Sequence, residues 1–203
     1  QEGNARYAAG QWEEALGAYR QMAALAPATA NAHAAVGMAL QAGRRYEEAM
    51  RAFERAAALQ ETPAGLLRLG TARLLAGQSA GALAAFDRAA GMDERNAAAQ
   101  QNRAVALMTL HRLSEAMEAV ERSLALNGGF GQAHNTRAAL LLEAGRPAEA
   151  VAAFRRALDL DATLPRSNWL AALHHDPGMR VEEIVAAHRE WGAGVQAAAR
   201  PAT

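Results

Sequence analysis

The sequence has no cysteine and no lysine, and all 21 of its basic residues are arginine. Without cysteine, disulfide scaffolds, thiol nucleophiles and cysteine-based zinc sites are excluded. The basic residues are balanced by 21 acidic ones, so the formal net charge is zero. A neutral chain gains little from counterion release or electrostatic steering. We therefore expect neither nucleic acid nor an anionic membrane surface as a partner.

Aromatic residues and long apolar runs are also scarce. Aromatics make up only 5% of the chain, and no run reaches the roughly 18 apolar residues of a membrane-spanning helix. No basic segment followed by an apolar stretch indicates a signal peptide. We therefore expect no membrane partner and a cytoplasmic location. The sequence begins at Gln1 without methionine, and we interpret it as a piece of a longer chain.

Alanine is the most abundant residue. It supplies roughly a quarter of the residues, far above average usage, and it explains a hydrophobic fraction of 51% with few aromatics. Because alanine is both the best helix former and a small side chain, the composition predicts helices that pack closely through small contacts.

Three columns of residues recur in phase along the chain. An alanine repeats with a nearly constant period, at Ala15, Ala49, Ala82, Ala116 and Ala150. Four residues later stands a larger side chain: Tyr19, Phe53, Phe86, Val120 and Phe154. Twelve residues before each alanine stands a small residue: Gly3, Gly37, Gly70, Ala104 and Ala138. This register predicts repeats at about 1–29, 30–62, 63–96, 97–130 and 131–164.

The columns suit a helix–turn–helix unit. The alanine and the larger residue are four positions apart, so they share one face of the second helix. The small residue of the first helix lets the second helix approach closely. Turn glycines are expected between the two helices at Gly10, Gly43, Gly77 and Gly145.

This pattern resembles the tetratricopeptide repeat (TPR) family. The second repeat matches at Gly37, Ala39, Tyr46, Ala49, Phe53 and Ala56, and the fifth at Ala138, Gly145, Ala150, Phe154 and Ala157. The resemblance implies an all-α fold, a right-handed TPR superhelix (α-solenoid) of about five repeats over residues 1–164. It also implies a concave groove, lined by the first helices, that binds protein or peptide segments.

The groove-facing positions are rich in amides, which both donate and accept and so suit a peptide backbone. The candidates are Asn31, Met38, Arg68, Thr71, Gln101, Asn102 and Asn135. The alternative is that they are simply solvated polar residues. The carboxylate clamp of chaperone-type TPR domains is disfavoured because it uses lysine. Arg68 alone can meet one carboxylate, unless it is solvated or paired within the chain.

The sequence offers no catalytic constellation. It has no glycine-rich phosphate loop and no nucleophile elbow. The pairs Glu13–Glu14 and Glu47–Glu48 fall at helix starts, where they favour the helix dipole. His174, His175 and His188 are candidate metal ligands. His174 and His175 are adjacent in sequence, however, so one helix face does not present both of them to a metal. We expect no catalytic residue, metal or cofactor in this chain.

The register fails after residue 164, where we predict a capping or linker helix pair over residues 165–196 and a tail over 197–203. An apolar stripe marks the last helix, at Val181, Ile184, Val185, His188 and Trp191. Such a stripe is expected either to seal the last repeat or to dock another domain or another copy of the chain.

Residues 167–192 resemble the junction between TPRs and catalytic region in bacterial and plant relatives of O-GlcNAc transferase, the SPINDLY-like proteins. The matching residues are Ser167, Asn168, Leu170, Ala172, Leu173, Pro177, Glu182, Glu183, Ala187, His188, Arg189 and Trp191. That family transfers a sugar from a nucleotide donor to protein hydroxyls. The resemblance implies a substrate-selecting region whose catalytic domains are not in this chain. Asn102 and Asn168 match the family's concave asparagine ladder, which makes Asn168 a further groove candidate, whereas Ala35, Arg68 and Thr136 depart from it.

The main alternative is a free-standing TPR adaptor or self-assembling scaffold, and a third possibility is a small-ligand site in the groove. The first two differ in the environment of Trp191. An adaptor is expected to bury this side chain against the fifth repeat. A detached region is expected to leave part of the stripe exposed, or covered by another copy.

Overall fold

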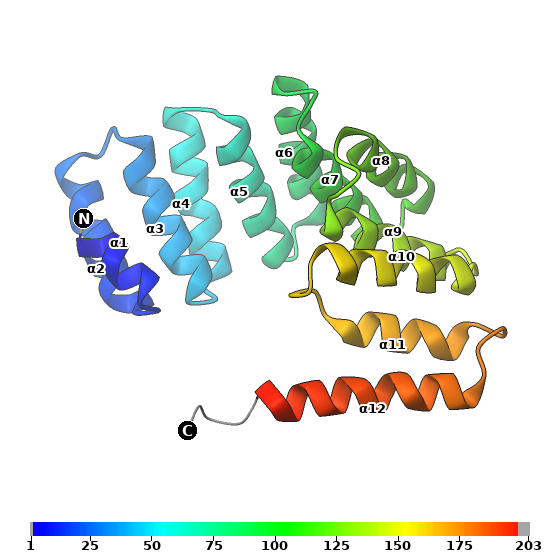
Figure 1. Ribbon diagram of the computed structural model, residues 1–203. Coiled ribbons are helices and arrows are strands. Elements are labelled where there is room, and N and C mark those ends of the chain that lie inside the picture. Colours follow the sequence, from blue (N-terminus) through cyan, green and yellow to red (C-terminus); the bar gives the residue numbers. More distant parts are fainter. Residues whose placement is uncertain (1, 199–203) are drawn as a thin grey trace. The chain divides into compact units, whose positions relative to one another are not determined.

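The computed structural model describes residues 2–198, and the surroundings of the side chains as far as residue 192. Every regular element in this part of the chain is an α-helix, which confirms the all-α prediction (Figure 1). No helix within it is long and apolar enough to cross a membrane. The chain divides into two compact units, Gln1–Glu115 and Ala116–Thr203. Of the predicted tail, residues 199–203 lie outside the described residues.

The first unit contains seven whole helices. They are α1 (Glu2–Ala8), α2 (Trp12–Leu25), α3 (Ala30–Ala42), α4 (Tyr46–Leu59), α5 (Pro63–Leu75), α6 (Ser79–Met92) and α7 (Ala97–Thr109). The boundary between the units falls inside α8 (Leu113–Leu126). The second unit continues with α9 (Gly131–Glu143), α10 (Pro147–Leu160), α11 (Arg166–His175) and α12 (Val181–Ala198). Within each unit a helix packs mainly on the helices next to it in sequence, as in a solenoid.

The small and large columns meet inside each helix pair. A Cβ atom added to Gly70 on α5 would lie 2.7 Å from Cδ1 of Phe86 on α6. At the same place in the preceding pair, a Cβ atom on Gly37 would lie 2.8 Å from Cε1 of Phe53. Glycine therefore lets the aromatic ring lie directly against the backbone of the first helix. This close approach is the physical basis of the repeat register.

The turn inside each repeat contains one residue in the left-handed region. Its φ is 75° at Gly10, 77° at Gly77 and 70° at Gly145. In the second and fourth repeats the same position holds Arg44, with φ of 59°, and His111, with φ of 57°. Gly43 lies between the helices as expected, but it is the C-cap residue of α3 and its φ is −77°. The left-handed residue of this turn is therefore Arg44. The chain therefore places a side chain in two turns where the other repeats use glycine.

An arginine–glutamate pair recurs at the start of the second helices. Arg45 Nε donates to Glu48 Oε1 over 2.7 Å, and Arg146 Nε donates to Glu149 Oε1 over 2.6 Å. These hydrogen bonds hold the pKa of both glutamates below the ordinary carboxyl range. Arg112 and Glu115 form the same pair before α8. Each pair places a carboxylate in the first turn, where the helix dipole favours it.

The same pair shows that the register continues into the last two helices. Arg180 and Glu183 form it at the start of α12, one repeat period after Arg146 and Glu149. On α11, Ala172 lies one repeat period after Ala138, and both are fully buried. The interpretation that the register fails after residue 164 is therefore corrected. The continuing register is not apparent from the hydrophobic columns, because Ile184 and His188 stand where the other repeats have alanine and a larger core residue.

Candidate functional site

Helices α1, α3 and α5, together with α2 and one residue of α4, line two adjoining cavities, which we call together the Arg68 groove. The larger has a volume of about 660 Å³ and the smaller of about 360 Å³. The larger is lined by Glu2, Gly3, Asn4, Ala18, Tyr19, Gln21, Met22, Leu25, Ala26, Asn31, Ala34, Ala35, Met38 and Arg68. The smaller is lined by Tyr7, Met38, Gln41, Ala42, Phe53, Leu67, Arg68 and Thr71. Met38 and Arg68 belong to both, so the two cavities form one surface.

Arg68 is the charged centre of this groove. Its side chain is exposed on α5, and no carboxylate among the side chains that the structure describes forms an ion pair with it. Glu2 also lines the groove, but Arg6 pairs with it over 2.6 Å. Arg68 therefore presents a free planar guanidinium, which suits bidentate binding of a carboxylate.

Two tyrosines and an asparagine shape the N-terminal part of the groove. Tyr19 Oη donates to Asn4 Oδ1 over 2.8 Å. Burial, reinforced by the nearby Tyr7, raises the pKa of Tyr19 above its ordinary value of 10.0, so its phenol keeps its proton. Tyr19 uses one of the two lone pairs of the Asn4 carbonyl oxygen, so the second lone pair and both NH₂ donors remain available to a ligand. The ring of Tyr7 packs edge-on against Trp12, with centroids 5.1 Å apart.

The C-terminal part of the groove combines acceptors with soft apolar surface. Thr71 Oγ1 donates to the Leu67 carbonyl over 2.9 Å, so both lone pairs of its oxygen are left to accept from a ligand. Gln41 adds a half-buried amide, and Met38 adds a flexible thioether that adapts to different side chains. The groove can therefore bind a polar backbone and an apolar side chain together.

The structure brings together four of the eight predicted groove residues. Asn31, Met38, Arg68 and Thr71 all line the Arg68 groove. Gln101 does not belong to an accessible surface, which corrects its prediction. Only 6% of it is exposed, because α7 packs against both α5 and α6. A buried amide is engaged within the protein and is not offered to a peptide.

The remaining three predicted residues do not line the Arg68 groove. Asn102 is half-buried on α7, beside the ion pair between Arg103 and Asp87. Asn135 on α9 is half-buried and Asn168 on α11 is exposed, and both belong to the second unit. For these three residues, participation in a common ladder stays a prediction.

Three groove residues were missed by the sequence reasoning, although the repeat register contained the signal. Asn4 lies one repeat period before Met38, and Tyr7 lies one period before Gln41. Both therefore occupy groove-facing columns of the first repeat. Tyr19 was assigned only to the core, yet it also lines the larger cavity, where its hydroxyl donates to Asn4.

The stripe on α12 is largely exposed in the second unit. The exposed fraction is 70% for Val181, 40% for Val185 and 41% for Trp191, while Ile184 is half-buried. His188 forms a hydrogen bond between its Nε2 and that of His174 on α11, 3.1 Å away. One ring must donate and the other accept, so at least one of the two is neutral. Among the described residues no group of three His, Asp or Glu side chains is placed to hold a metal ion.

Comparisons with known proteins agree on the repeat architecture. Two family models, both described as tetratricopeptide repeat, match residues 1–65 with 67–129 and residues 131–164. No curated protein sequence matches the chain significantly.

Solved structures with the same fold share about a fifth of their residues with this chain. TTC0263, a thermophilic TPR protein of Thermus thermophilus, is 20% identical with a TM-score of 0.70, over 85% of this chain and 95% of its own. MamA from Desulfovibrio magneticus is 18% identical with a TM-score of 0.70, over 79% and 92%. YrrB, described as a TPR protein with an unusual peptide-binding site, is 22% identical with a TM-score of 0.65, over 85% and 87%. The repeat register, the helix pairs and the family models together show that the chain belongs to the tetratricopeptide repeat family.

Proposed function

We propose that this protein is a protein–protein interaction module that binds an extended peptide segment in the Arg68 groove. The observation that carries the proposal is the free guanidinium of Arg68, which faces both cavities of the groove and has no acidic partner among the described side chains. The solved relative YrrB, whose description names a peptide-binding site, supports this role.

The groove offers complementary groups for each part of such a peptide. Arg68 binds a carboxylate of the peptide, from an Asp or Glu side chain or from a free C-terminus. Asn31 and the NH₂ group of Asn4 donate to backbone carbonyls, and Asn31 also accepts from a backbone N–H. Met38 covers an apolar side chain next to the carboxylate. The peptide thus needs an acidic group and an adjacent apolar residue.

The Arg68→Gln variant is expected to lose about tenfold or more in affinity for such a peptide, because a charge-assisted bidentate contact contributes roughly 1.5–3 kcal/mol. The peptide is first selected from a library of random twelve-residue sequences on the wild-type protein. Isothermal titration then compares the wild type with the variant. Glutamine keeps most of the side-chain volume, so the change reports on the charge and its hydrogen bonds.

The matched control is Arg95→Gln, which removes an exposed arginine from the α6–α7 turn, outside the groove. Its affinity for the selected peptide should equal that of the wild type. The proposal fails if Arg68→Gln and Arg95→Gln bind the peptide equally well, or if the library yields no peptide that binds the folded protein.

A finer hypothesis concerns the helix pair α11–α12. We infer that it links the repeats to the catalytic domains of a SPINDLY-like protein glycosyltransferase, for which the groove selects protein substrates. The support is the sequence resemblance of residues 167–192, together with the exposed stripe around Trp191. The alternative is a free-standing adaptor or scaffold, in which the stripe docks on a second copy of the chain.

These two assignments give different results for the Val185→Glu variant and for the gene. For a linker, the coding sequence after Thr203 continues into two nucleotide-sugar-binding domains, and a chain that includes these domains is monomeric with or without the substitution. For a self-assembling scaffold, light scattering shows dimers or larger species that Val185→Glu dissociates, because it places a charge inside an apolar contact. An open reading frame without such domains would rule out the glycosyltransferase link.

A further inference from the structure

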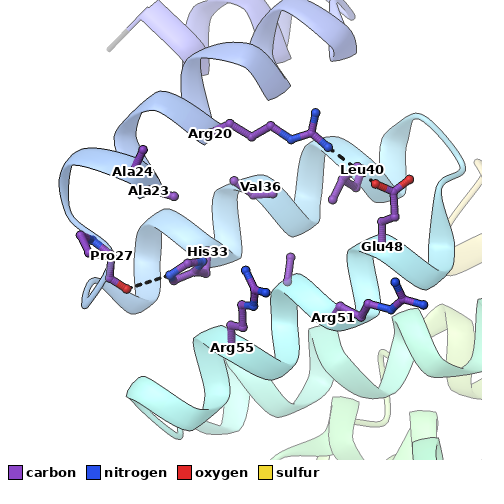
Figure 2. A pocket seen from close by; sticks show the side chains of 11 residues that line it. Arg20, Ala23, Ala24, Pro27, His33, Val36, Leu40, Glu48, Arg51 and Arg55 are labelled. Carbon is purple, nitrogen blue, oxygen red and sulfur yellow. Dashed lines mark hydrogen bonds and ion pairs between the residues drawn. The ribbon is translucent and has the colours of Figure 1, made fainter.

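A third cavity of the first unit lies on a different surface, and we call it the outer cavity. It has a volume of about 470 Å³, within the range of small-ligand sites. Its lining residues come from α2, α3, α4 and the loop before α3: Arg20, Ala23, Ala24, Pro27, His33, Val36, Leu40, Glu48, Arg51, Ala52 and Arg55. It shares no lining residue with the Arg68 groove. Figure 2 shows Arg20 reaching from one wall while Arg51 and Arg55 extend from α4 on the opposite wall.

The outer cavity carries an excess of positive charge. Glu48 is its one acidic lining residue, and its carboxylate is already engaged by two hydrogen bonds from Arg45 and by Arg20 at 3.6 Å. Arg51 and Arg55 are exposed and form no salt bridge with any described side chain, although the charge of Arg51 contributes to the lowered pKa of Glu48. They lie four residues apart, one helical turn, where like charges repel. A bound anion would relieve this repulsion.

Comparison with a later repeat shows why the cavity is open and basic. Between α6 and α7, Arg103 Nε donates to Asp87 Oδ1 over 2.6 Å and bridges the two helices. By the repeat register, the residue equivalent to Arg103 is Val36, and the one equivalent to Asp87 is Arg20. Between α2 and α3 the bridging arginine is thus replaced by a short apolar side chain, and the acid by a base. The substitution at both positions removes the bridge and reverses the charge of one wall.

The floor of the outer cavity is apolar. Leu40 and Ala52 are buried beneath it, and Val36 is half-buried. At one end, His33 Nε2 lies 2.8 Å from the carbonyl oxygen of Pro27, which fixes the ring with its proton on this nitrogen. Figure 2 shows this contact beside the apolar floor. The site therefore combines an apolar surface with arginines on both sides of it.

We propose that the outer cavity binds an acidic peptide segment in which an apolar residue is flanked by Asp or Glu. The apolar side chain covers Val36 and Ala52, and the flanking carboxylates meet Arg51 and Arg55 on one side and Arg20 on the other. A small inorganic anion fits less well, because it would leave the apolar floor in water. The outer cavity shares no lining residue with the Arg68 groove, so it would be a second, separate peptide-binding surface.

The test uses a fluorescein-labelled peptide of sequence Glu-Glu-Leu-Glu-Glu-Leu-Glu-Glu, whose C-terminus is amidated so that it carries no terminal carboxylate. Fluorescence anisotropy measures its binding to the wild-type chain. The double variant Arg51→Gln/Arg55→Gln should weaken binding by about tenfold or more, because it removes two charge-assisted contacts. Binding should also weaken as salt is raised, since exposed charges are screened.

The matched control is Arg122→Gln, which removes an exposed arginine at the same repeat position as Arg55 but on α8. This control should bind the labelled peptide like the wild type. In an Arg68→Gln background, which removes the carboxylate-binding group of the Arg68 groove, the double variant should still weaken binding by about tenfold or more, which separates this site from the Arg68 groove. If Arg122→Gln and the double variant lost the same affinity for the peptide, the effect would come from the overall charge of the chain, and the proposal would be overturned. Undetectable binding of the peptide to the wild type, or binding of pyrophosphate but not of the peptide, would also overturn it.

Discussion

The Phe86→Ala variant is expected to lose about 3–5 kcal/mol of unfolding free energy, the usual cost of deleting a fully buried aromatic ring. Phe86 is 0% exposed, and its ring lies against Gly70 on the facing helix. Glycine has no side chain that can move into the vacated space, so little of the cavity can close. Urea unfolding followed by far-ultraviolet circular dichroism measures the loss.

The control is Phe86→Leu, which keeps much of the buried volume and should cost clearly less than alanine. A loss below about 1 kcal/mol for Phe86→Ala would mean that the ring is not a main core contact. The interpretation of the large-residue column would then be wrong, and with it the explanation of the repeat register.

The Gly70→Val variant is expected to destabilise the protein by about 1–3 kcal/mol or more through overpacking. A Cβ atom at this position would already lie 2.7 Å from Cδ1 of Phe86, and valine adds two further methyl groups. The ring and the backbone of α5 would have to move apart, which disturbs the whole helix pair. Thermal and urea unfolding both report this change.

Gly17 on α2 provides the matched control, because no atom lies within 4 Å of a Cβ added there. Gly17→Ala should stabilise the protein by about 0.5–1 kcal/mol, the gain of alanine over glycine inside a helix. The combination of Gly70→Val with Phe86→Leu should be less damaging than the sum of the two, since the smaller side chain relieves the overlap. Strict additivity would contradict a direct contact between the two positions.

The fold was largely predictable because it depends on spacing. The contact between Gly70 and Phe86 repeats that between Gly37 and Phe53, and periodicity in the sequence is enough to reveal such a contact. Periodicity failed at α12, where Ile184 and His188 interrupt both columns. The register there is carried by the ion pair of Arg180 and Glu183, a side-chain contact that the hydrophobic pattern does not contain.

The candidate site was predictable only where the residues at one repeat position face the groove. Arg68 and Met38 could be placed because groove-facing positions recur at a fixed offset from the core alanine. The burial of Gln101 could not be predicted, because it depends on how closely α7 packs on its neighbours. The outer cavity was also missed, since it arises from Arg20 and Val36 facing each other across two helices, and neither residue is unusual by itself.

The two left-handed turns without glycine have a consequence for how the protein tolerates mutation. Arg44 and His111 adopt a conformation that costs an L-residue with a side chain roughly 1–2 kcal/mol. Glycine would avoid this strain, although part of the gain is offset by its greater loss of freedom on folding. Glycine substitutions at these two surface positions are therefore a way to increase the stability of the protein. Substitutions that weaken the protein elsewhere, including those that adapt its binding surfaces to new partners, could be offset there without altering either surface.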